Sequence, residues 1–77
     1  MENNERIIID TDKLDISFKD IENIEFNDIE KEIIERAKSY KEDSKYYLEK
    51  EDMMTSFGCI TYSHGLIDAL KIIHELI

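Results

Sequence analysis

Apolar and charged positions divide this chain into two parts near Asp52. The chain holds 19 acidic and 10 basic residues, yet residues 53–77 contain only Asp68, Glu75 and Lys71 as charged side chains. This last third is apolar on nearly every face if it forms a helix. A charged shell followed by one apolar helix predicts a small bundle in which the last helix is the central one.

The clearest helix is predicted over residues 28–50. Asn27 is a good N-cap residue, and Glu30, three positions later, completes a capping box. A stripe then follows at alternating spacings of four and three, consisting of Ile33, Ala37, Tyr40, Ser44 and Tyr47. The small side chains of Ala37 and Ser44 predict that a neighbouring helix comes close.

A third helix is predicted over residues 53–76, with Asp52 as its cap. It carries two apolar stripes: Phe57, Ile60, His64, Ile67, Lys71 and His74 form one, and Tyr62, Leu66, Ala69, Leu70, Ile73, Leu76 and Ile77 form the other. Two such faces indicate a helix that is covered from two sides. Gly58 and Gly65 share a face and cost about 1 kcal/mol each relative to alanine. Close helix packing at these glycines, and at the small Ala69, is the expected compensation.

The first segment fits two patterns. Leu14, Ile16 and Phe18 alternate as in a strand, but a helical stripe also runs through Ile7, Thr11, Leu14, Phe18 and Ile21. A lone strand would have no partner in a helical chain, so we expect a helix over residues 5–22. The sequence thus predicts an all-α fold, an up-and-down three-helix bundle forming one domain over residues 1–77.

Composition narrows the function classes. A net charge of −9 argues against nucleic acid and anionic membrane surfaces as partners. The acidic N-terminus does not resemble a signal peptide, and no apolar stretch reaches the roughly 20 residues of a membrane span. A single cysteine, Cys59, fits a reducing compartment, so we expect a cytoplasmic protein. A chain of this length buries only about 60% of its unfolded surface, which makes oligomerisation a natural aid to stability.

Candidate chemistry is sparse. His64 and Asp68 are four residues apart, a spacing that orients a general base but equally makes an ordinary polar contact at a helix seam. With Tyr62 and with Asp43 of the second helix they form a candidate ligand cluster, although Tyr62 also fits a core position. No nucleophile accompanies the pair, and the Glu-x-x-His repeat of carboxylate–histidine metal sites is missing. We therefore expect no enzyme activity, metal or cofactor.

Two segments carry a resemblance to a known family. They are YLEKED over residues 47–52 and YSHGLIDA over residues 62–69. Both are similar to an archaeal family known only as DUF357, whose members tend to read FLEKGD and YAHGWLDA. This chain departs from that pattern at Glu51, Ser63 and Leu66. The resemblance implies an archaeal source and a compact three-helix bundle, but no activity.

A looser similarity is to HEPN domains, which are helical partners of minimal nucleotidyltransferases. Their ribonuclease members place an arginine shortly before a histidine, where this chain has Phe57, Gly58 and Cys59 before His64. The resemblance therefore implies a non-catalytic version. Our leading hypothesis is an interaction module that forms a homodimer or binds a protein partner. The alternatives are a regulatory partner of another enzyme and a small-ligand or nucleotide-binding protein that uses Tyr62, His64 and Asp68.

Overall fold

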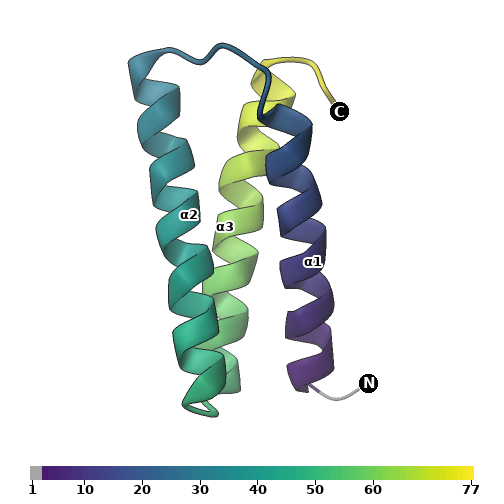
Figure 1. The fold of residues 1–77 in the computed structure, drawn as a ribbon, viewed down its shortest axis with the longest axis vertical. Coiled ribbons are helices and arrows are strands. Elements are labelled where there is room, and N and C mark those ends of the chain that lie inside the picture. The colour runs from purple at the N-terminus through teal and green to yellow at the C-terminus, as the bar shows by residue number, and fades with distance from the viewer. Residues whose placement is uncertain (1–2) are drawn as a thin grey trace.

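The computed structural model describes residues 3–77 as three α-helices, with no strand in that range. They are α1 (Asn3–Ile21), α2 (Asp28–Glu49) and α3 (Met53–Ile73). The chain runs up, down and up again, and α3 packs against both of the other helices, which hardly touch each other (Figure 1). The predicted all-α, up-and-down bundle is confirmed, and the ambiguous first segment is a helix.

The hydrophobic core follows α3. On α1 the predicted stripe is buried at Ile7, Leu14 and Ile21. The core cluster consists of Leu14, Ile21, Ala37, Ile60, Ile67 and Leu70. None of the helices within residues 3–77 is both long and apolar enough to cross a membrane.

The predicted helix starts have the expected caps. The Asn27 side chain accepts a hydrogen bond from the Glu30 backbone N–H at 2.8 Å, and Glu30 Oε1 accepts one from the Asn27 N–H at 3.0 Å. This reciprocal pair is a complete capping box. Asp52 caps α3 through a 3.2 Å bond from the Thr55 N–H.

The predicted end of the third helix is wrong by three residues, since α3 ends at Ile73 and not at residue 76. Glu75 takes a left-handed backbone with φ of 58°. Its N–H donates to the Ile72 carbonyl at 3.1 Å, and the Leu76 N–H donates to the Lys71 carbonyl at 2.8 Å. These bonds form a Schellman motif, which closes a helix and turns the chain away from its axis.

The end of α2 is built in the same way. Glu51 has φ of 63°, its N–H donates to the Leu48 carbonyl at 3.0 Å, and the Asp52 N–H donates to the Tyr47 carbonyl at 2.9 Å. Glu51 is the position where the resembled family favours glycine, the residue that adopts this conformation most readily. The short turn brings α3 directly back along α2.

Candidate functional site

The predicted ligand cluster does not converge. His64 and Tyr62 are two residues apart and lie about 200° apart around the helix axis, so they project to opposite sides of α3. The ring of Tyr62 packs at a tilt of 49° against that of Tyr40 on α2, with ring centroids 4.6 Å apart. Asp68 and Asp43 are both exposed, and within residues 3–77 neither forms a hydrogen bond or an ion pair.

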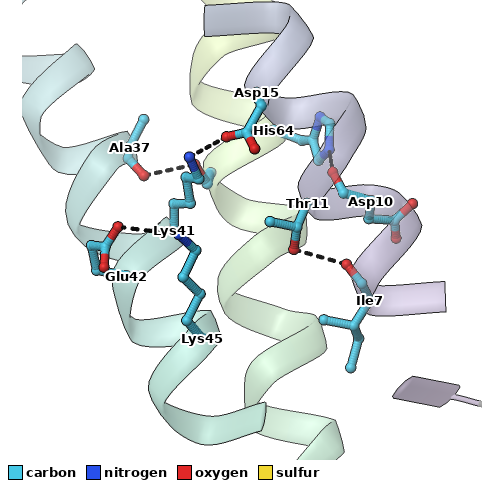
Figure 2. Close-up of polar contacts among 10 residues, drawn as sticks. Ile7, Asp10, Thr11, Asp15, Ala37, Lys41, Glu42, Lys45 and His64 are labelled. Carbon is cyan, nitrogen blue, oxygen red and sulfur yellow. Dashed lines mark hydrogen bonds and ion pairs between the residues drawn. The ribbon is translucent and has the colours of Figure 1, made fainter. Parts of the chain in front are cut away.

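His64 links α3 to α1. Its Nε2 atom lies 2.7 Å from the backbone carbonyl oxygen of Asp10, as Figure 2 shows. A carbonyl oxygen can only accept, so Nε2 carries the proton and donates it. The imidazole is therefore used for a helix contact, and the paired His64–Asp68 general base is not formed.

Two lysines attach α1 to the rest of the bundle, and sequence reasoning missed both. Nζ of Lys71 is 3.0 Å from Asp20 Oδ2 and 3.2 Å from Ser17 Oγ, and its side chain is only 9% exposed. Lys41 of α2 reaches across to an ion pair with Asp15 of α1 (Figure 2). Their partners are far away in sequence, so no local pattern indicates these pairs.

Small residues form the seam between α2 and α3. Ala37 and Ser44, predicted to lie at a helix contact, are buried there. Ser44 Oγ donates to the Ser56 carbonyl at 2.9 Å, and Ser56 Oγ donates to the Ser44 carbonyl at 2.7 Å. Ser63 Oγ donates to the Ala37 carbonyl at 2.7 Å. Each of these buried hydroxyl groups therefore donates a hydrogen bond to a backbone carbonyl of the opposite helix.

The close packing predicted at Gly58, Gly65 and Ala69 is not found within the bundle. All three residues are exposed, and a Cβ atom added at either glycine would meet nothing within 4 Å. The reason is their position on the helix. Ser56 and Ser63 occupy the seam, and each glycine follows one of these serines by two residues, which places it about 200° around the axis.

These positions belong to an uncovered surface, which we name the outer face of α3. It consists of Met54, Gly58, Thr61, Tyr62, Gly65, Asp68, Ala69, Ile72 and Ile73, all exposed. Met54 is 86% exposed, Ile72 62% and Ile73 63%. Asp68 is the one charged side chain of this face. The predicted second stripe shares only Tyr62, Ala69 and Ile73 with this face. Its Leu70 is buried and its Leu66 packs on the core, so α3 is covered from two sides as predicted, and the outer face is a third side.

A groove of about 710 Å³ separates α1 from α2. It is lined by the apolar side chains of Phe18, Ile21, Ile24, Phe26 and Ile34 together with Lys19, Glu22, Lys38, Lys41 and Glu42. Since α1 and α2 both pack on α3 and make few contacts with each other, the groove is open to solvent along one side.

A second histidine joins the ends of two helices. His74 Nε2 lies 2.6 Å from Oε2 of Glu30, and the Phe26 ring meets the His74 ring edge-on at 4.9 Å. The bond from the Asn27 N–H holds the pKa of Glu30 below its ordinary value, and His74 lowers it further while burial opposes both. The cap at Asn27 was predictable, whereas the link to His74 was not.

The one cysteine is not poised for chemistry. Burial raises the pKa of the Cys59 thiol, and the nearby carboxylates of Asp43 and Asp52 raise it further. The thiol is therefore protonated at neutral pH and is a poor nucleophile. Within residues 3–77 no three His, Cys, Asp or Glu side chains are placed to hold a metal ion.

Comparison with known proteins extends the sequence resemblance to nearly the whole chain. Residues 10–76 match the family model described as "Protein of unknown function (DUF357)". A comparison with curated proteins gives no match.

Proposed function

This chain belongs to the DUF357 family, and we propose that it is a non-catalytic interaction module that self-associates through the outer face of α3. The observation that carries the proposal is that face itself. Single exposed apolar residues are common on proteins, but a contiguous apolar surface indicates a contact site. Here the outer face of α3, from Met54 to Ile73, combines exposed apolar side chains with two glycines and carries a single charged side chain.

The charge distribution favours a second copy as the occupant. Each chain has a net charge of −9, so two copies repel each other over most of their surfaces. The outer face of α3 carries a single acid, Asp68, so two copies that meet there bring few like charges together.

The polar residues support a non-catalytic role. His64 donates a hydrogen bond to the backbone carbonyl of Asp10, and Tyr62 packs on Tyr40 on the other side of α3. A catalytic acid or base must reach its substrate and its orienting group together. The dispersal of Tyr62, His64 and Asp68 also removes the support for the small-ligand hypothesis, which required them in one place.

The test is the solution mass, measured by light scattering after size exclusion at two protein concentrations. We expect twice the 9.2 kDa of one chain for the natural sequence. Ala69→Arg should return the mass to that of one chain, because it places a charge on the outer face. Ser39→Arg adds the same charge to an exposed position of α2 and should leave the dimer intact. A single-chain mass for the natural sequence at both concentrations would contradict self-association.

The groove between α1 and α2 favours a second candidate, a regulatory partner of another enzyme. Its apolar floor and its lysines fit an apolar segment flanked by acids. Co-purification from the native host tests this candidate. One recurrent protein retained by Ala69→Arg but lost with Lys38→Glu would support it, and the absence of any recurrent protein would count against it.

A further inference from the structure

The outer face of α3 is arranged in three columns. Residues seven apart lie almost two turns apart, so they stand nearly above one another on a helix. Gly58, Gly65 and Ile72 form the central column. Thr61 and Asp68 form the column on one side, and Tyr62 and Ala69 form the column on the other. All of these residues are exposed, and both glycines have open space where a side chain would be.

We propose that a second copy of this chain docks on this face with its α3 antiparallel, about a two-fold axis through Gly65. The inference rests on the proposed self-association and specifies its geometry. Such an axis reverses the helix direction while keeping each column opposite the same column of the other copy. Thr61 then faces Asp68 of the second copy, Tyr62 faces Ala69, and Gly58 faces Ile72.

Each of these pairings is complementary. The Asp68 carboxylate can only accept hydrogen bonds, and the Thr61 hydroxyl is a donor. The Tyr62 ring lies over the small Ala69 side chain, and Ile72 fills the space left open at Gly58. At the axis, Gly65 meets its own copy, which lets the two backbones approach closely where no side chain stands between them.

Other symmetric arrangements are poorer because of Asp68. A parallel pair of α3 helices related by a two-fold axis would exchange the two outer columns. It would place Asp68 against Ala69 of the second copy, where the carboxylate gains no hydrogen-bond donor. An antiparallel pair with its axis midway between the two glycines would move Asp68 onto Met54 and Phe57. There the carboxylate would lose water without gaining a donor, which is costly.

The chain already uses this kind of contact on the other side of α3. The seam with α2 is antiparallel and places small residues seven apart on both helices, Ala37 and Ser44 against Ser56 and Ser63. Hydroxyl groups bond across that seam. The outer face repeats the seven-residue spacing with Gly58 and Gly65. Its Thr61 hydroxyl is available to donate a hydrogen bond across the interface.

Single-cysteine variants in a Cys59→Ser background test the register under mild oxidation. Gly65→Cys should form a disulfide-linked dimer, because the two Cα atoms at the axis lie within the roughly 4–7 Å that a disulfide spans. Thr61→Cys is the matched control, since its two copies are offset by about 12 Å along the helices and should not cross-link. Mixing Thr61→Cys with Asp68→Cys should restore a mixed disulfide.

The outcomes separate the register from self-association. Cross-linking of Thr61→Cys alone would overturn the proposed axis in favour of the midway one. A dimeric mass without any of these disulfides would also overturn it, while self-association itself would stand. A single-chain mass for the natural sequence would remove both.

Filling the open space at Gly58 gives an independent test. Gly58→Leu removes the space for Ile72 and should weaken the dimer at least tenfold, measured by sedimentation at several concentrations. The melting temperature at a dilution where the chain is monomeric should not fall, because the added side chain meets nothing in its own copy. Unchanged dimerisation with this variant would contradict the proposed pairing.

Discussion

Two glutamates, Glu51 and Glu75, hold the left-handed backbone conformation that closes a helix, with φ of 63° and 58°. A residue with a Cβ atom pays roughly 1–2 kcal/mol for this conformation, and glycine does not. Both glutamates are exposed, so their side chains contribute no packing in return. At the scale of single residues, these two positions are therefore the places where the chain stores backbone strain.

Glu51→Gly should stabilise the protein by about 0.5–1 kcal/mol, because relief of the left-handed strain exceeds the extra flexibility of glycine in the unfolded chain. Urea unfolding at neutral pH measures the change. Glu49→Gly, two residues earlier within α2, serves as the control and should destabilise by a similar amount. A loss of stability with Glu51→Gly would show that the side chain has a stabilising role.

The shifted pKa of Glu30 predicts a pH dependence of stability. Its pKa in the folded state lies below the ordinary value because of the Asn27 N–H and His74, so the ionised form stabilises the fold. This contribution is fully present above the unfolded-state pKa and is lost as the pH falls through the folded-state pKa.

Glu30→Gln should therefore be less stable than the natural chain at about pH 7, and the difference should shrink as the pH falls below about 4. Thermal unfolding across this range measures both. Glu35→Gln, at an exposed site of the same helix whose side chain is 74% exposed, should leave the pH profile unchanged. A difference between the natural chain and Glu30→Gln that stays constant with pH would contradict this account.

At the scale of helices, the seam between α2 and α3 depends on small side chains. Ser44 and Ser56 are each 1% exposed or less, and their hydroxyls bond to the backbone of the opposite helix. A hydrogen bond of this kind contributes about 1 kcal/mol. The larger requirement is volume, because a long side chain at either position would force the helices apart.

Ser44→Ala should therefore cost about 1 kcal/mol, and Ser44→Leu about 2–3 kcal/mol or more. Chemical denaturation measures both. Ser39→Leu makes the same change at an exposed position of α2 and should stay within about 0.5 kcal/mol of the natural chain. Equal losses of stability with Ser44→Leu and Ser39→Leu would mean that the seam is not tightly packed.

How far the sequence predicts these elements depends on how local each signal is. The caps at Asn27 and Asp52 are formed by neighbours three residues away, and the stripe of α1 repeats along one helix, so both could be read from the sequence. The end of α3 could not, because its left-handed residue is Glu75 and not glycine. The orientation of Gly58 and Gly65 could not either, since a helix that is apolar all round does not indicate which face turns inward.

The candidate site was less predictable for the same reason. The partner of His64 is a backbone carbonyl 54 positions away on another helix, and a carbonyl has no signature in the sequence. The spacing of His64 and Asp68 correctly puts them on neighbouring turns. It does not indicate that one turns toward α1 while the other faces solvent.

At the scale of the whole molecule, charge sets the conditions for self-association. A chain with a net charge of −9 repels its copy. Salt at 0.1 M limits the range of this repulsion to a Debye length of about 10 Å. The outer face of α3 is mostly apolar, so its attraction does not depend on ion pairs that salt would weaken.

Dimerisation should therefore strengthen as sodium chloride is raised from about 20 to about 200 mM. Sedimentation at fixed protein concentration and neutral pH measures the shift. A dimer that weakens over this range would indicate an interface of ion pairs, which contradicts the use of the outer face.

The central place of α3 also orders the events of folding. The tight turn after α2 makes the α2–α3 pair a local hairpin of helices, whereas α1 must close onto α3 from the other end of the chain. Contacts of low sequence separation form early in a folding transition state. Ser44→Ala should therefore slow refolding, while Leu14→Ala should mainly accelerate unfolding, as stopped-flow measurements would show. α1 then joins last, and an assembly of two chains through α3 requires only the hairpin.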